Sequence, residues 1–165
     1  MRVSEITGTI MRVQLGRLDL ILEGLRARKS IFREKLARQS LAKVIVGACA
    51  DGDSGSSLHL LFPDPEVAMR LSKGLRQQGM LFAPVTTRPA HACWKWTPLL
   101  GDRAHWHSAA NPFKLTARPY QYPTTEYLES VGILMRTAKM EIDLNCSLDE
   151  TVRLAELLSQ TLSHT

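Results

Sequence analysis

The chain has 165 residues, of which 44% are hydrophobic, and this is enough for one small domain with a buried core. No run approaches the roughly 18 apolar residues that a membrane-spanning helix requires. We expect no signal peptide, because the N-terminus lacks a short apolar block with a small-residue cleavage site. Cys49, Cys93 and Cys146 are too widely spaced for a disulfide framework, so we expect reduced thiols in a cytoplasmic protein.

The first 38 residues predict one long amphipathic helix. Ser4 suits its N-cap, and apolar residues then recur every three to five positions at Ile6, Ile10, Val13, Leu18, Leu22 and Leu25. Such a helix would be about 50 Å long, which is more than a single small domain usually holds. We therefore expect residues 1–38 to join two bodies or to pack in an oligomer.

The net charge of +5 lies entirely on this predicted helix. Residues 1–38 carry nine basic and four acidic residues, whereas residues 39–165 carry twelve of each. A basic helix is one form of nucleic-acid footprint. More often a basic helix is a solvated face, or one that docks on an acidic surface of its own protein. We favour this interpretation over nucleic-acid binding.

The region 43–85 predicts a β-β-α-β unit. Its elements, in chain order, are a strand at 43–49, a turn at 51–55, a strand at 58–62, a helix that begins at Asp64 and Pro65 and ends at Gly79, and a strand at 80–85. A unit of this kind is typical of a two-layer α+β domain.

The region 86–123 predicts a long irregular loop. It holds five of the eight prolines, all three tryptophans and three of the five histidines, and no regular period runs through it. Loops this long are usually functional or disordered, and the aromatic content argues against disorder.

Regular structure returns near the C-terminus. We expect a short helix at 124–131, a strand at 133–142 and a final helix that opens with a capping box at Ser147 and Glu150. The predicted fold class is therefore α+β. A long connecting helix (1–38) precedes a small two-layer domain (39–165) with a mostly antiparallel sheet and packed helices.

Residue spacing gives little support for a metal site, a nucleophilic Cys/His pair or a phosphate-binding loop. His91, Cys93, His105 and His107 have spacings that occur in metal sites, but no Cys-x-x-Cys or His-Glu-x-x-His motif accompanies them. We interpret them as hydrogen-bonded loop residues and predict no metal site. A nucleophilic Cys/His pair has no identifiable orienting residue. The glycines at 51–55 lie between two strands, where they would not cradle a phosphate.

Three pieces of sequence stand in an order that resembles a known family. The first is Arg2-Val3-Ser4-Glu5, followed by Gln14-Leu15 and Arg17-Leu18-Asp19; the second is the unit at 56–85; the third runs from His105 to Phe113 and through Tyr120-Gln121-Tyr122-Pro123 to the closing strand and helix. Together they are similar to the region after the catalytic half of DegT-type sugar aminotransferases. Many members have Cys-Pro where this chain has Tyr122-Pro123.

The resemblance implies the type I aminotransferase fold, whose small domain this chain would form, and a homodimer. Such enzymes transfer an amino group to a keto-sugar nucleotide or a keto-cyclitol through pyridoxal phosphate held as a Schiff base on a lysine. In the family, that lysine and the other cofactor-binding groups precede the Arg-Met-Ser-Glu helix. None of the seven lysines here has the family context. The resemblance therefore predicts a truncated or split enzyme with no catalytic residue of its own, which alone binds no pyridoxal phosphate stably.

A few residues remain as candidate site residues. By resemblance, Arg2 is the first position that could lie near the cofactor. By chemistry, the candidate substrate contacts in the loop are Trp94, Trp96, His105, His107 and Asn111.

The expected partner is a second copy or a missing catalytic half, bound through residues 1–38, and the expected substrate is of the sugar-nucleotide type. Without that half, the apolar stripe of the helix should be exposed. The alternative is a non-catalytic binding module whose basic helix and aromatic loop bind nucleic acid or a protein partner.

Overall fold

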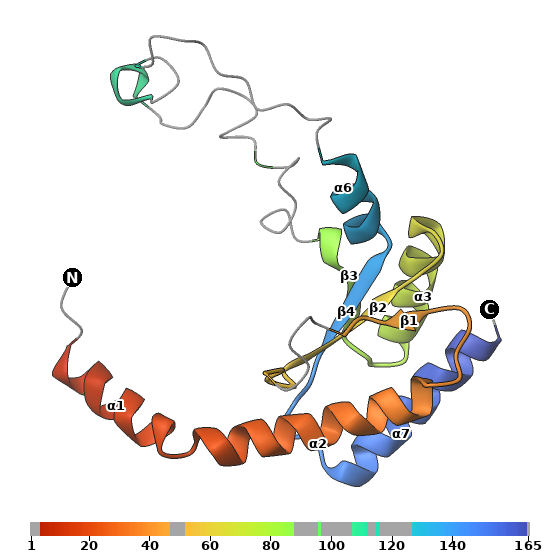
Figure 1. Cartoon of the computed structure of the whole chain (residues 1–165), viewed down its shortest axis with the longest axis horizontal. Helices are drawn as coiled ribbons and strands as arrows, with labels where there is room; N and C mark the ends of the chain where they lie inside the picture. The colour runs from red at the N-terminus through yellow and green to blue at the C-terminus, as the bar shows by residue number, and fades with distance from the viewer. Residues whose placement is uncertain are drawn as a thin grey trace.

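The structure is a computed structural model of the whole chain, and it describes residues 4–46, 52–87, 96, 107–111, 115 and 127–164. The helices are α1 (Glu5–Leu15), α2 (Leu18–Leu36), α3 (Pro65–Gln77), α6 (Leu128–Met135) and α7 (Leu148–Ser163), with short 3-10 turns η1 (Val85–Thr87) and η4 (Ser108–Ala110). The strands are β1 (Lys43–Val44), β2 (Ser57–Leu61), β3 (Phe82–Pro84) and β4 (Thr137–Glu141). Figure 1 shows their arrangement.

The predicted α+β fold class is confirmed. The strands form a four-stranded sheet in the order β1-β2-β4-β3, and every neighbouring pair is antiparallel. β4 therefore lies between β2 and β3, and Met140 is opposite both Leu58 and Phe82. These three side chains are buried on one face of the sheet.

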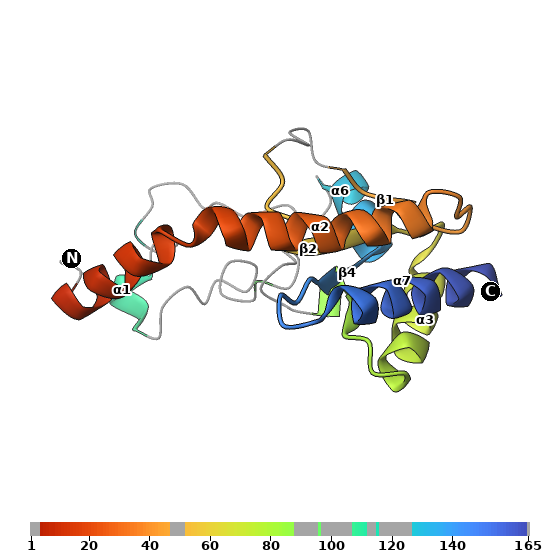
Figure 2. The ribbon, with the colours of Figure 1, turned by 90° about the horizontal axis from the view of Figure 1, so that it is seen from below.

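Helices α2, α3 and α7 cover that face. They contribute buried side chains to a single core: Phe32 and Leu36 from α2, Leu71 and Leu75 from α3, and Leu158 and Leu162 from α7. α2 and α7 lie side by side and run in the same direction (Figures 1 and 2). Near their C-terminal ends, Lys35 pairs with Glu156, and Gln39 donates a hydrogen bond to Ser159. Packing against α7 thus fixes the second half of the predicted connecting helix to the domain.

The opposite face of the sheet is more polar. It carries Ser57, His59 and Leu61 on β2, all of which are half-buried, and their partners on β4. His59 lies directly opposite Lys139, and Lys139 lies opposite Ala83 of β3. The alternation along β2 follows the strand period of two, as predicted from the sequence.

The predicted helix starts are confirmed by their caps. The Asp64 side chain accepts a hydrogen bond from the backbone N–H of Val67 at 2.8 Å, and Ser147 accepts one from Glu150 at 3.1 Å. The capping box at Ser147 is only half formed. The Glu150 carboxylate accepts from Arg153 Nε at 2.9 Å instead of bonding back to the N-cap.

Several predicted elements have other bounds in the structure. Of the strand predicted at 43–49, the described residues form only β1, Lys43–Val44, and the helix predicted at 124–131 is α6, Leu128–Met135. The single helix over 1–38 is divided into α1 and α2 at Gly16, where the N–H of Arg17 turns to bond the carbonyl of Gln14. The strand predicted at 133–142 begins only at Thr137, because the residues up to Met135 belong to α6. An apolar run of this length fits a helix or a strand equally well by pattern alone.

Within the described part of the chain, no helix is both long and apolar enough to cross a membrane. This agrees with the absence of a long apolar run in the sequence.

Candidate functional site

The structure describes only part of the predicted site. Arg2, Trp94 and His105 lie outside the described residues. Trp96 is 43% exposed, and His107 is exposed, with its Nδ1 accepting a hydrogen bond from the N–H of Ala109 at 3.2 Å. Asn111, in contrast, is buried.

The residues that could form a metal site also lie mostly outside the part of the chain that the structure describes. His91, Cys93 and His105 are not among the described residues, so their spacing to His107 is not tested. Among residues 4–46, 52–87, 96, 107–111, 115 and 127–164, no cluster of three or more His, Cys, Asp or Glu side chains is placed to hold a metal ion.

Helix α1 presents an exposed apolar surface. Ile6, Ile10 and Val13 on α1 are 75%, 56% and 58% exposed, and Leu18, the first residue of α2, is 42% exposed. We call these four residues the α1 stripe. No side chain of α1 is buried. Figures 1 and 2 show why: α1 extends beyond the sheet, at the opposite end of the molecule from the C-terminus. The exposed stripe that we predicted for residues 1–38 is therefore present.

The basic side chains of α2 are largely occupied within the domain. Of the eight basic residues described in 4–38, four bond to acceptors outside the helix: Arg26 to the carbonyl of Asp53, Arg28 to that of Cys146, Lys29 to the Asp53 carboxylate and Lys35 to Glu156. This is what we expect of a basic face that docks on its own protein.

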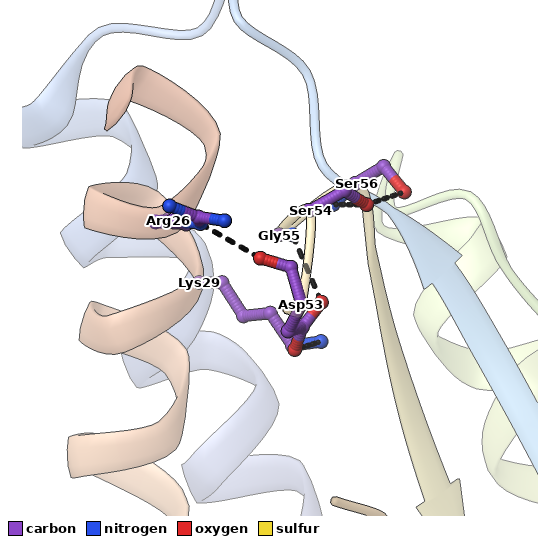
Figure 3. A network of polar contacts seen from close by, with 6 residues as sticks. All are labelled: Arg26, Lys29, Asp53, Ser54, Gly55 and Ser56. Atoms are coloured by element: carbon purple, nitrogen blue, oxygen red, sulfur yellow. Dashed lines mark hydrogen bonds and ion pairs between the residues drawn. The ribbon is translucent and has the colours of Figure 1, made fainter. Parts of the chain in front are cut away.

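The segment that leads into β2 docks directly on α2 (Figure 3). The carboxylate of Asp53 lies 2.6 Å from Lys29 Nζ and accepts a second hydrogen bond from the N–H of Gly55 at 2.9 Å. These two bonds hold the pKa of Asp53 below its ordinary value. Because Lys29 is itself nearly buried, the ion pair fixes the segment to the helix.

Gly55 brings the two backbones together. Its φ is +76°, and a Cβ at this position would lie 2.7 Å from the backbone nitrogen of Arg26. Only glycine combines this left-handed conformation with so close an approach. The turn between the first two strands was predicted from its composition, but its contact with α2 was not.

A cavity of about 560 Å³ lies on the polar face of the sheet. His59, Lys139 and Glu141 belong to its lining, and Lys139 Nζ is 2.7 Å from the Glu141 carboxylate. No hydrogen bond joins the His59 imidazole to another residue in the described part of the chain. The sequence did not single out these three residues. Pairing the polar positions of the strands at 58–62 and 133–142 would have brought them together.

The His59 pKa is lowered from its ordinary value of 6.5, chiefly by burial and secondarily by the nearby charges of Lys139 and Lys29. Glu141 and Asp53 act in the opposite direction but do not outweigh these effects. The imidazole is therefore neutral at neutral pH.

This shift predicts a loss of stability in mild acid. The unfolded chain takes up the His59 proton near pH 6.5, before the folded chain does, so the free energy of unfolding falls as the pH drops below that value. Replacing His59 with Gln should remove this part of the pH dependence. The measurement is urea unfolding of both proteins at about pH 7.5 and about pH 5.5.

Asp53 provides an internal control. Its lowered pKa contributes stability that is lost only as the pH falls below about 3.8. An equal loss of stability in wild type and His59→Gln between the two pH values would contradict the assignment to His59.

Comparison with known proteins adds no further constraint, since no model of a protein family matches this chain and no curated protein matches it either.

Proposed function

We propose that this chain is the small C-terminal body of a DegT-type, pyridoxal-phosphate-dependent sugar aminotransferase, completed by a catalytic body that docks on α1. In this proposal the enzyme acts on a keto-sugar nucleotide or a keto-cyclitol and is cytoplasmic. The small body serves in assembly and does not carry out the chemistry.

The exposed α1 stripe is the observation that carries the proposal. α1 has 11 residues and buries none of its side chains. An isolated helix shorter than about 12–15 residues is marginal in water, and most helices depend on packing of an apolar face. A partner that covers the stripe would supply that packing, and α2 would hold it at a fixed place on the domain.

The order of elements gives a second line of support. A helical segment leads into an antiparallel sheet with three helices on one face, which is the arrangement that the resemblance implies for the small domain. The pieces that carry the resemblance at Ser4-Glu5, Gln14-Leu15 and 56–85 lie on α1 and on the unit from β2 to β3.

Three of the five described lysines are engaged in ion pairs, whereas Lys43 and Lys73 are exposed and lie outside the lining of the cavity on the sheet. Only the deprotonated amine of a lysine attacks the cofactor aldehyde. Lys29, Lys35 and Lys139 are held 2.6 to 2.7 Å from the carboxylates of Asp53, Glu156 and Glu141, respectively. In this proposal the catalytic body supplies the Schiff-base lysine, because none of the seven lysines of this chain has the family context.

The chain alone should form no stable Schiff base. When it is mixed with pyridoxal phosphate and freed of excess cofactor, we expect no visible absorbance that borohydride abolishes, and no pyridoxyllysine in the digested protein. A stable adduct on one of its seven lysines would contradict the proposed division of roles.

The coding sequence of the source organism provides an independent test. We expect an open reading frame for a body with the Schiff-base lysine next to the codons of this chain, in the same or a shifted frame. A genome without any such partner would overturn the proposal.

A further inference from the structure

We propose that the cavity on the polar face of the sheet binds a small, electrically neutral polyhydroxy ligand, of the size of a monosaccharide. The proposal concerns a surface that α1 does not touch, and it does not depend on the aminotransferase resemblance. The cavity has a volume of about 560 Å³, which lies within the range of about 300–1,000 Å³ that is usual for small-molecule sites.

The charges of the cavity favour a neutral ligand. The lining contains two cations, Arg76 and Lys139, and two anions, Glu141 and Asp143, so its formal charges cancel when His59 is neutral. A di- or triphosphate would bring several negative charges to a site with no net positive charge. Such a ligand would gain little from the site electrostatically.

The ion pair between Lys139 and Glu141 in the cavity lining favours hydroxyl groups over a zwitterion as ligand. Lys139 and Glu141 already satisfy each other at 2.7 Å. An amino acid could use these two charges only by breaking their ion pair, and the Asp143 carboxylate already accepts a hydrogen bond from the N–H of Asn145 at 2.8 Å. A hydroxyl group both donates and accepts, so it can bond Glu141 and Lys139 while the pair stays intact.

His59 adds a third polar partner beside this pair. A neutral imidazole has one donor and one acceptor nitrogen, which again matches a hydroxyl group. Both nitrogens are available as far as the described residues are concerned. The adjacent β3 side of the cavity, with Leu81, Ala83 and Val85, supplies apolar contact for the C–H groups of a ring.

Saturation-transfer difference NMR on the full chain tests the proposal, with methyl α-D-glucoside as the probe. We expect transfer to the glucoside with a Kd of about 1 mM or somewhat weaker, as is usual for few contacts with a small ligand. Glycine, measured in the same way, should show no comparable transfer, and an excess of inorganic phosphate should not reduce the transfer to the glucoside.

Two variants and one matched control locate the binding. Lys139→Met and Glu141→Gln should each raise the Kd at least about fivefold, because the first removes a hydrogen-bond donor and the second replaces a charged acceptor with a neutral amide. Lys43→Met changes the same residue type on β1, outside the cavity lining, and should leave the Kd unchanged. Circular dichroism confirms that all variants are folded.

Three results would overturn the proposal. They are the absence of transfer to the glucoside, transfer that Lys139→Met and Glu141→Gln leave unchanged, and a preference for glycine or phosphate, seen as stronger transfer to glycine or as loss of the glucoside signal when phosphate is added.

Discussion

Replacing Gly55 with alanine should lower the free energy of unfolding by about 2–4 kcal/mol. A residue with a Cβ is strained at a φ of +76°, and that Cβ would lie only 2.7 Å from the backbone of α2. Backbone atoms cannot move aside as a flexible side chain can. The segment 53–56 must therefore leave the helix, and the ion pair between Asp53 and Lys29 is weakened. Urea unfolding followed by circular dichroism measures the loss.

Gly79→Ala is the matched control for this prediction. Gly79 also has a positive φ, +84°, but nothing lies within 4 Å of the position of its Cβ. It should cost only the conformational strain, about 1–2 kcal/mol. Equal losses for the two variants would show that the close approach to α2 contributes nothing.

Replacing Ile6, Ile10 and Val13 together with glutamine should abolish association through α1. Each apolar side chain contributes about 1.5–3 kcal/mol when it is fully buried, so three of them account for a change in affinity of more than a thousandfold. Glutamine forms helices at least as well as isoleucine or valine, so the helix itself is retained. In analytical ultracentrifugation, we expect the wild-type chain without its partner to self-associate and the variant to be monomeric.

The control carries glutamine at Met69 and Leu148, which are 53% and 51% exposed on α3 and α7. This variant should associate like the wild type. The stability of the α1 variant should also match that of the wild type, because no α1 side chain is buried in the domain. A monodisperse wild-type monomer, or equal loss of association in the control, would contradict an interaction through α1.

Local signals in the sequence predicted much of the fold. The start of α3 was predictable because Asp64 and Pro65 combine an N-cap with a preferred first position. The pairing of β1 with β2 follows from two strand-like runs around a turn. The C-terminal run at 133–142 was assigned wrongly in part, since its apolar residues fit α6 as well as β4.

The contacts that shape the candidate sites depend on tertiary structure and were not predictable in this way. The sequence gives no sign that the 53–56 segment packs on α2, because Gly55 looks like any turn glycine. His59 likewise looked like one polar position in an alternating strand. His59 belongs to a polar cluster because β4 lies beside β2 in the sheet, which brings Lys139 opposite His59.

The exposure of the α1 stripe was predictable, in contrast, because it depends on an imbalance within the sequence. The helical segment 1–38 is longer than the described part of residues 39–165 covers, and its first half buries no side chain. α2 packs against α7 through Phe32 and Leu36, and α1 is left without a described neighbour in the domain.

The most direct test of the central claim is to locate the cofactor lysine in the native assembly. The chain is tagged in its source organism, purified with whatever is joined or bound to it, reduced with borohydride and mapped by mass spectrometry. We predict pyridoxyllysine at a position outside residues 1–165, in the body that covers α1. Pyridoxyllysine on one of this chain's own lysines, or an assembly without any, would contradict the account.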